Sequence, residues 1–372
     1  MHLLRFLKFA SVSALFSLAP HANAQAPQWN PSAADLAQLV QRFRPYLKFS
    51  TGNRQEARPM TWQNLYNNAA LVNGNTTLLP VGSFAGPNAS KVLTLANING
   101  EPDVIKNYRI VVNDQAQYGE YWPQVMQGDG IYAHVTWLKT VTNTPTSPEL
   151  VNIEYYVLFG LNVGYVPAED HKGDLIGVEV VYDHKLDKLV RATFSEHGKT
   201  LIMFDLANAS APESATITGK DQNGKAISEP ACKINVSDHD YWSGGLSGGP
   251  GIFTGGDKHV FMTHDPVSGR CEHLAVYIEH GSHEPWPNQS GYYIGVASHN
   301  GDDVSFLPTT VHVLVFNPGD DDPFVLFGGN YGDPAGLERH RMWLGYFYND
   351  SPADQDPYID RGSLKWLPAV TP

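Results

Sequence analysis

Beyond its N-terminal stretch, the sequence has no apolar run long enough to cross a bilayer, which predicts a chain without an integral membrane segment. The N-terminal stretch, MHLLRFLKFASVSALFSLAPHANAQA, carries Arg5 and Lys8 ahead of an apolar run. The Ala-Asn-Ala tripeptide at 22–24 is typical of a signal-peptidase site. We therefore predict a signal peptide over residues 1–24 and a mature protein that is secreted or periplasmic.

Basic residues are scarce. The chain has 25 Lys and Arg against 38 Asp and Glu, for a formal net charge of −13. Loss of the signal peptide makes the charge more negative, because that segment contains basic residues and no acidic one. Nucleic acids and anionic membranes attract basic surfaces, so neither is expected as a partner.

Cysteine is almost absent, with only Cys232 and Cys271 in 372 residues. In an exported chain, an even pair is most simply interpreted as one disulfide. That disulfide would close a loop of roughly 39 residues and stabilise the fold by about 4 kcal/mol in the chain-entropy account. Two buried free thiols, or metal ligation by the pair, are less favoured alternatives.

Helical signals are also few. Ser32 is placed to cap a helix whose apolar residues recur at helical spacing until Pro45. A second, shorter helical candidate is TWQNLYNNAALV at 61–72. Elsewhere apolar residues alternate with period 2 between Gly, Pro, Asn and Asp, which is typical of strands and turns.

The strongest strand patterns lie at 150–161, 175–183, 188–198, 200–206, 273–281, 310–317 and 324–332. Strands joined by turns predict a mainly β chain, specifically a β-sandwich with one or two peripheral helices near the N-terminus. Residues 206–265 are rich in Gly, Ser, Asp and Asn, and we expect a long Gly-rich insertion there, pinned by the disulfide. Residues 25–372 would then form a single domain.

Three segments resemble catalytic motifs but do not meet the requirements of those motifs. GLSGG at 245–249 matches G-x-S-x-G, but it lacks the strand and helix that flank a nucleophile elbow. GSHE at 281–284 cannot belong to a helical zinc motif, because Gly281 and Pro285 forbid the helix. The glycines at 244–256 lack the G-K-[ST] ending of a phosphate loop.

Histidine and carboxylate occur together at three strand ends, EDHKGD (169–174), SEHG (195–198) and EHGSHE (279–284). Taken singly, such histidines are more often structural, hydrogen-bonded to a carboxylate or a carbonyl. Three clusters in one chain favour a divalent metal or an acid–base pair. The candidate metal ligands are His171, Asp174, His197, His280 and His283.

Strand periodicity refines this choice. His280 continues the apolar row of Ile278, whereas Glu279 projects to the other face. Glu179 should project away from Asp174, and we discount it as a partner. Calcium prefers oxygen ligands, so a histidine-rich site favours zinc or manganese. The remaining histidines are expected to be structural: His134, His184, His239, His259, His264, His273, His299, His312 and His340.

Residues 39–72, LVQRFRPYLKFSTGNRQEARPMTWQNLYNNAALV, resemble the opening of the vacuolar protein sorting 62 family. The segments HKGDLIGVEV, FSEHG and AVYIEHGSHEPWP are similar to that family's H-x-G-D-W-E-x-V, Y-S-x-H-x-G and V-Y-x-A-x-G-S-H-A-x-Y-P. Order and spacing agree across residues 39–300. Leu175-Ile176 stand where the family has Trp-Glu, so one carboxylate of the central motif is missing.

That family is distantly similar to the necrosis- and ethylene-inducing-like proteins. These are secreted β-sandwiches whose H-x-H-D-W-E motif helps to hold a divalent cation in a cleft that meets sphingolipid head groups. By this resemblance, His171 and Asp174 would hold a cation, with His197, His280 and His283 on adjoining strand ends. Because a shared fold does not transfer activity, this step is an analogy.

Two classes of function follow. The first is a secreted protein, binding or lytic, that recognises a glycan or glycolipid head group through the His/Asp metal site. Trp286, Tyr292 and Tyr293 would supply flat apolar surfaces, although a packed edge aromatic is an equal interpretation of Trp286.

The alternative is a secreted metal- or His-dependent polysaccharide hydrolase or lyase. His280 or His197 would act as the base, oriented by Asp174 or Glu279. The sequence favours binding, and it leaves open whether the chain is an enzyme, which ligand it takes and which protein partners it has.

Overall fold

The computed structural model describes residues 32–50, 58–61, 64, 67–73, 76–82, 108–112, 122–138, 150–162, 171–196, 199–236, 239–241, 259–279, 283, 285–288, 303–314, 330–331 and 340–341. The chain forms two compact units, Met1–Asn30 and Pro31–Pro372, and every described residue belongs to the second. The predicted signal peptide therefore lies outside the described residues.

Helix α1 (Ala33–Arg42) confirms the predicted N-terminal helix. The Ser32 hydroxyl accepts a hydrogen bond from the Asp35 amide at 3.2 Å, and the Asp35 carboxylate accepts one from the Ser32 amide at 2.8 Å. This capping box satisfies two donors that the first helical turn leaves unpaired. The helix buries Leu39 and Val40, and the Tyr155 hydroxyl donates to the Val40 carbonyl at 2.8 Å.

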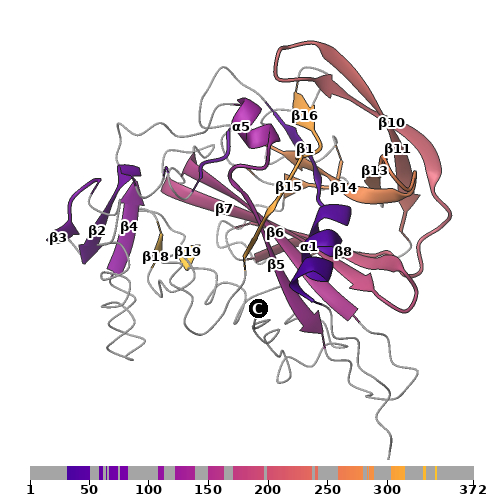
Figure 1. Ribbon diagram of the computed structural model, residues 1–372, viewed down its shortest axis with the longest axis horizontal. Helices are drawn as coiled ribbons and strands as arrows, with labels where there is room; N and C mark the ends of the chain where they lie inside the picture. Colours follow the sequence, from indigo (N-terminus) through magenta and orange to yellow (C-terminus); the bar gives the residue numbers. More distant parts are fainter. Residues whose placement is uncertain are drawn as a thin grey trace, which may run out of the picture. The chain divides into compact units, whose positions relative to one another are not determined.

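An open sheet of seven strands contains all four strands predicted between residues 150 and 206 (Figure 1). Its order is β12 (His239–Tyr241), β9 (Lys199–Asp205), β8 (Lys188–Glu196), β7 (His171–Asp183), β6 (Leu150–Asn162), β5 (Ile131–Leu138) and β17 (His312–Leu314). Neighbouring strands are antiparallel except β17 and β5. Strand β6 is buried on both faces from 151 to 160, as its nearly continuous apolar sequence requires.

A second sheet closes on itself. Its order is β1 (Tyr46–Phe49), β16 (Val304–Phe306), β10 (Glu213–Lys220), β11 (Ala226–Asn235), β13 (His259–His264) and β14 (Cys271–Ile278), with β15 (Pro285–Trp286) also paired to β14. Strand β1 pairs antiparallel with β16 and parallel with β14, which completes a ring of six strands. We call this sheet the closed sheet.

A third sheet is small. Its order is β19 (His340–Arg341), β18 (Asn330–Tyr331), β4 (Tyr108–Val112), β2 (Ala69–Asn73) and β3 (Thr76–Leu79). The helix predicted over 61–72 is confirmed only in part: Asn64, Asn67 and Asn68 are helical, whereas the residues from Ala69 onward pair with β4. Whether these residues form a helix or a strand depends on their pairing partner β4, which the local sequence pattern does not reveal.

A short helix, α5 (Trp122–Met126), was not predicted, because five residues are too few for a helical period to be recognised. Neither described helix combines the length with the apolar character that a membrane span needs.

The prediction of a mainly β chain with few helices is confirmed. A β-sandwich was also predicted, and the structure differs from a clear sandwich because it has separate sheets, one of which β1 closes into a ring. Such a pairing links residues more than two hundred positions apart, which a local alternation of apolar residues does not specify.

Residues 206–265 also differ from the expected insertion. They contribute β10, β11, β12 and β13, and three of these strands belong to the closed sheet. Strands β10 and β11 are exposed on one face and rich in Ser, Thr, Ala and Glu, so they lack the apolar rows by which a strand is recognised. The predicted disulfide Cys232–Cys271 is confirmed, and it joins β11 to β14.

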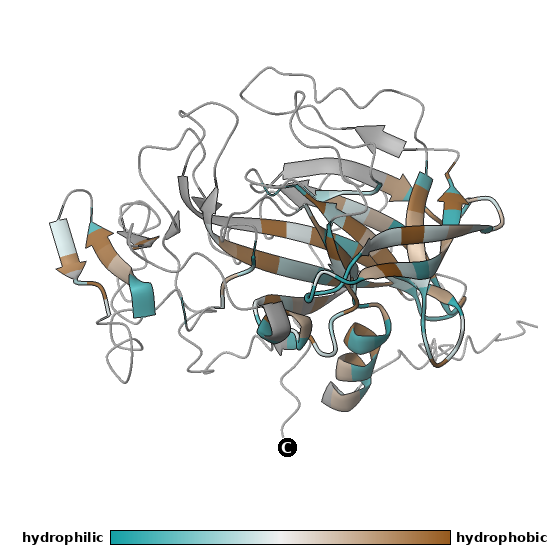
Figure 2. Cartoon of the chain, turned by 90° about the horizontal axis from the view of Figure 1, so that it is seen from above, coloured by the Kyte–Doolittle hydropathy of each residue, from teal (hydrophilic) through white to brown (hydrophobic). Residues whose placement is uncertain are grey.

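The open and closed sheets meet through aromatic side chains. The ring of Phe49 in β1 lies 6.4 Å from the Phe159 ring of β6 and 5.7 Å from the Phe306 ring of β16, measured between centroids. Phe49 and Phe159 are fully buried. Brown and paler segments alternate along the strands in Figure 2, as expected for strands with one face turned to a core.

Candidate functional site

The predicted ligands His171 and Asp174 lie at the beginning of β7, which starts at His171. In the register of β6 and β7, His171 is opposite Asn162 and Asp174 is opposite Phe159. Both backbone positions are therefore at the end of the sheet where β6 finishes. The side chains of His171 and Asp174 lie outside the described residues.

Strand β8 finishes at the same end of the open sheet. Its last residue, Glu196, is opposite Ile176, and the predicted ligand His197 follows directly in the chain. The backbone thus brings residues 171–174 and 195–196, the described parts of the EDHKGD and SEHG segments, to one end of the sheet. His197 itself, like His280, Tyr292 and Tyr293, lies outside the described residues.

His283 reaches this end from the closed sheet. Its imidazole lies flat on the Phe159 ring, with centroids 3.8 Å apart and planes inclined by 7°. Since Phe159 is opposite Asp174, the backbone position of Asp174 is separated from His283 by one aromatic residue. The structure therefore brings two of the predicted ligand positions close together.

The backbone of His283 is unusual. Its φ is +58°, in the left-handed region that residues with a Cβ atom rarely adopt. Its side chain is fully buried. Such a conformation costs on the order of 1–3 kcal/mol and persists only where the surroundings impose it. His283 is thus held firmly in place at the end of the open sheet.

Trp286 lies opposite Tyr277 in the pairing of β14 and β15, and only 4% of its surface is exposed. Its indole ring is therefore covered by its neighbours, which agrees with its interpretation as a packed aromatic. A sugar-stacking surface at Trp286 is not what the described structure offers.

Two buried glutamates face each other at the middle of the open sheet. Glu154 of β6 is opposite Glu179 of β7, and Glu179 is opposite Thr193 of β8. Glu154 accepts hydrogen bonds from Asn152 at 3.1 Å and from the Tyr156 hydroxyl at 2.7 Å. This pair was not predicted as a unit, because the register that aligns the two strands is not visible in either strand alone.

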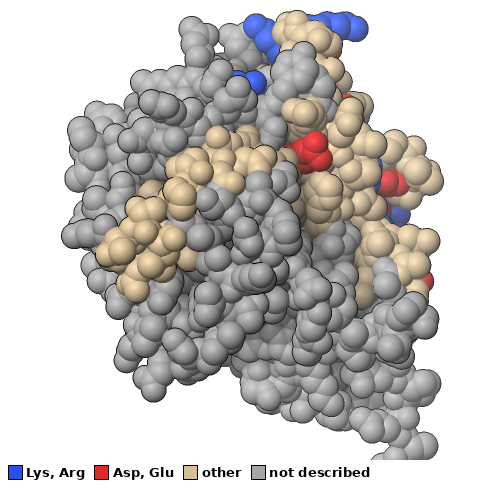
Figure 3. Space-filling view, turned by 60° about the vertical axis from the view of Figure 1, so that its left-hand side comes forward, with Lys and Arg blue, Asp and Glu red and all other residues tan. Residues whose placement is uncertain are grey.

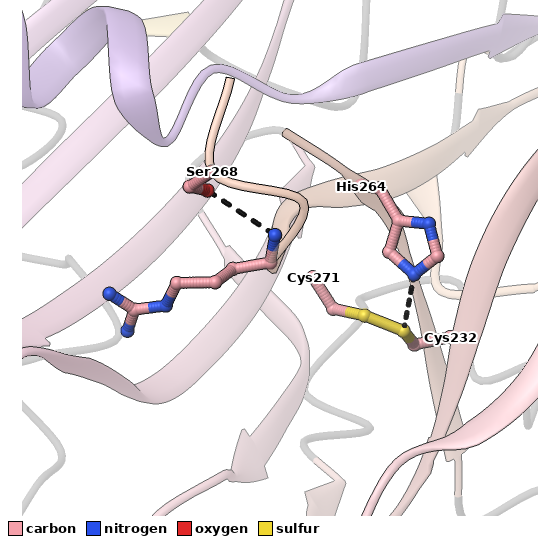
Figure 4. Close-up of a disulfide and its surroundings, with 5 residues drawn as sticks. Cys232, His264, Ser268 and Cys271 are labelled. Atoms are coloured by element: carbon pink, nitrogen blue, oxygen red, sulfur yellow. Dashed lines mark hydrogen bonds between the residues drawn. A yellow bond between two sulfur atoms is a disulfide. The ribbon is translucent and has the colours of Figure 1, made fainter. Parts of the chain in front are cut away.

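A second group of metal-ligand side chains surrounds the disulfide (Figure 4). Cys232, His264 and Cys271 each offer a ligand atom, and these atoms all lie within 4.8 Å of one another. The His264 Nε2 atom lies 3.2 Å from the Cys232 Sγ atom. Cys232 is buried, whereas His264 and Cys271 are half-buried.

The curvature of the closed sheet assembles this group. Strand β13 lies between β11 and β14, and two strands on either side of a third are about 9.6 Å apart in a flat sheet. The Cα atoms of Cys232 and Cys271 are only 6.1 Å apart. A register shift between Thr263 and His264 occurs at the same place, and such irregularities bend a sheet.

His264 is among the histidines expected to be structural, so the local sequence patterns miss this group. One signal could have found it: the segment DPVSG after His264 is a turn sequence, which predicts a hairpin that places His264 opposite Cys271. The structure has this pairing.

Charged side chains do not form a broad surface of one sign among the described residues on the face in Figure 3; blue and red atoms occupy separate places there.

Comparison of the chain with protein-family models, with curated proteins and with solved structures finds no match. The resemblance to the vacuolar protein sorting 62 family therefore stays a prediction.

Proposed function

We propose that this chain is a secreted binding protein that recognises a glycan or glycolipid head group through a divalent metal. The proposed metal ligands are His171, Asp174, His197, His280 and His283. Zinc or manganese suits this set better than calcium, because imidazole nitrogen is a poor ligand for calcium.

The observation that carries the proposal is the position of Phe159. This residue is opposite Asp174 in the strand register and carries the His283 imidazole on its ring. The backbone of Asp174 and the imidazole of His283, more than one hundred residues apart in the sequence, are therefore both neighbours of Phe159. An apolar floor of this kind also strengthens the attraction between a cation and a carboxylate, because it lowers the local dielectric constant.

A metal bound in this way could keep coordination positions for the ligand. Where three of the five candidate residues bind the ion and the others lie around it, a position is left for water, and an incoming oxygen can replace that water. Sugar hydroxyls and head-group phosphates are oxygen ligands of this kind. The proposed metal would therefore recognise the polar part of a glycan or glycolipid directly.

The hydrolase alternative has less support. That alternative needs His280 or His197 as the base, with Asp174 or Glu279 to orient it. Of these residues the structure describes the side chain of Glu279, which is only 2% exposed, so a polysaccharide does not reach its carboxylate.

Thermal melts with zinc, manganese and calcium, each compared with chelator, test the metal site. A ligand that binds only the folded state stabilises it by about 2.7 kcal/mol when its free concentration is a hundred times its dissociation constant. Asp174→Asn and His280→Ala should remove this increment. His312→Ala should not, because His312 is an exposed residue of β17 at which no ligand was predicted. Equal metal responses in all three variants would refute the site.

An array of glycans and lipids, screened with and without chelator, tests the recognition. Retention that disappears with chelator supports metal-dependent binding. Products released without stable retention would instead support the hydrolase or lyase. Retention that is insensitive to both chelator and Asp174→Asn would show that the chain binds its ligand elsewhere.

A further inference from the structure

We infer that Cys232, His264 and Cys271 form a separate metal site, which takes zinc or another thiophilic divalent ion when the disulfide is reduced. This site is independent of the proposed His/Asp site. It lies on the closed sheet, where its three ligands come from β11, β13 and β14.

The donor set and its spacing suit zinc. Two thiolates and one imidazole are common zinc ligands, with bonds of about 2.3 Å to sulfur and 2.0 Å to nitrogen. Tetrahedral geometry with those bonds separates the ligand atoms by about 3.5 Å. The three atoms here already lie within 4.8 Å of one another, so rotation of side chains is enough to adjust them. Water would take the fourth position.

The disulfide and the metal exclude each other, because a sulfur atom in a disulfide carries no thiolate charge with which to bind zinc. Reduction therefore frees both sulfur atoms for metal binding, and bound zinc is ligated by both thiolates. Every newly synthesised chain carries its thiols reduced, so the metal-binding form precedes the disulfide. Exchange with a small-molecule disulfide, which takes up the two electrons and leaves as two thiols, would re-form the Cys232–Cys271 disulfide and release the ion.

The reduction proceeds by thiol–disulfide exchange with a dithiol. One thiolate of the dithiol attacks the Sγ atom of Cys271, the more accessible of the two cysteines, and Cys232 leaves as a thiolate. The second thiolate of the dithiol then displaces Cys271, so the reductant leaves as a disulfide and the protein gains two electrons. The protons that the thiols carry pass to solvent when the metal binds.

His264 has a role in both steps. Its Nε2 atom lies 3.2 Å from the Cys232 Sγ atom, where an N–H group would stabilise the departing thiolate. Figure 4 shows the imidazole directed at that sulfur atom. In the tautomer that carries its hydrogen on Nδ1, the same Nε2 atom can bind the metal.

Cobalt binding tests the site. The full chain is reduced with dithiothreitol, freed of it without air, and titrated with Co²⁺ while the near-ultraviolet spectrum is recorded. Thiolate ligation gives a sulfur-to-cobalt charge-transfer band, which the His/Asp site has no sulfur to produce. We expect the band to saturate at one cobalt per reduced chain, to vanish when zinc is added, and to be absent from the oxidised protein.

Two histidine variants complete the test. His264→Ala should weaken cobalt binding by more than about tenfold, since even an outer-shell partner of a ligand can be worth that much. His259→Ala, at the other end of the same strand, should bind cobalt as the unaltered protein does. Circular dichroism of each reduced protein shows whether it is folded.

Three results would overturn the inference. The first is a folded, reduced protein without the band. The second is equal cobalt affinity in the unaltered protein and His264→Ala. The third is a fold lost on reduction that neither cobalt nor zinc restores. Because Asp174→Asn and His280→Ala should retain the band, failure of the His/Asp site and failure of this site are distinguishable.

Discussion

Arg42 binds Glu272 through two parallel hydrogen bonds, from Nε to Oε2 at 2.9 Å and from Nη2 to Oε1 at 2.6 Å. The pair fastens the end of α1 to β14 of the closed sheet. The third nitrogen of the guanidinium, Nη1, reaches Asp187 at 2.7 Å, in the turn between β7 and β8. One side chain thus joins α1 to both large sheets, and its hydrogen bonds to the Glu272 carboxylate raise the pKa of Arg42.

Arg42→Met should destabilise the fold by about 1.5 to 3 kcal/mol, the range for hydrogen bonds to a charged group, because Arg270 still lies 3.0 Å from the Glu272 carboxylate. The variant leaves the carboxylate of Glu272 without its bidentate partner, and that side chain is only 5% exposed. Urea unfolding measures the change. Lys225→Met, in the exposed turn between β10 and β11, is the matched control and should stay within about 0.5 kcal/mol. Equal effects of the two substitutions would contradict a structural role for the pair.

Asp187 should make the fold sensitive to acid. Hydrogen bonding to Arg42, the largest cause, lowers the pKa of Asp187 below its unfolded value of about 3.9. A group whose pKa is lower in the folded state stabilises that state above the unfolded pKa, and this contribution is lost as the pH falls through the folded pKa. Asp187→Asn should therefore reduce stability near neutral pH and flatten its loss below about pH 4.

Asparagine is the suitable replacement at this position because Asp187 has a φ of +49°, which asparagine tolerates. Unfolding measured across the acid range gives the comparison. Parallel pH profiles for the two proteins would mean that Asp187 has no part in the acid transition.

Lys48 and Asp303 should show energetic coupling. Lys48 is 1% exposed; its Nζ atom donates to the Thr218 carbonyl at 2.6 Å and lies 3.6 Å from an Asp303 carboxylate oxygen. Lys48→Met leaves Asp303 buried without this cation and should cost about 3 to 5 kcal/mol. Asp303→Asn should cost much less in that background than alone, with a coupling energy of about 1 to 3 kcal/mol.

The pH dependence of this pair provides a second measurement. Burial lowers the pKa of Lys48, so the unfolded chain binds its proton more tightly than the folded chain does. The resulting penalty is present at neutral pH and is relieved as the pH rises from the folded pKa towards the unfolded value of about 10.4. Lys48→Met should lack this relief. Additive effects in the double variant, with unchanged alkaline behaviour, would exclude the coupling.

The disulfide should stabilise the closed sheet. It joins residues 39 positions apart, for which loop closure alone predicts about 4 kcal/mol. Replacing both cysteines by alanine should lower the melting temperature and leave the circular dichroism spectrum β-dominated. Reduction of the unaltered protein is the second measurement, and its melts are run with chelator so that no ion binds the two free thiolates. An unchanged melting temperature after reduction would mean that the sheet alone fixes Cys232 and Cys271.

Local patterns predicted much of the open sheet. Strands β6 to β9 follow one another with apolar runs and short turns, so each strand pairs with its successor and no distant information is needed. The helix cap at Ser32 and the pairing of the only two cysteines were also predictable, because the sequence offers few alternatives to either.

The ring and the ligand groups were not predictable in this way. Closure of the sheet depends on Phe49 meeting residues of β14 and β16, and nothing near position 49 encodes those partners. His264 meets Cys232 because β13 bends at a register shift, and a bend of this kind has no periodic signature. The sequence indicated which residue types bear chemistry, whereas long-range pairing decides which of them meet.

The stacked pair Phe159 and His283 can separate packing from metal binding. Phe159→Leu removes the ring under the imidazole and should destabilise the protein by about 1 to 2 kcal/mol, less than the 3 to 5 kcal/mol typical of Phe→Ala in a core. It leaves every proposed ligand in place, so zinc or manganese should still raise the melting temperature.

His283→Phe has the opposite effect, because a flat ring can still stack on Phe159 while both ring nitrogens are lost. If His283 is a ligand, the metal increment should vanish in His283→Phe and survive in Phe159→Leu. Differential scanning fluorimetry of both variants, with metal and with chelator, makes the comparison. A metal increment that survives in His283→Phe would remove His283 from the ligand set and leave it as a packing residue of the sheet end.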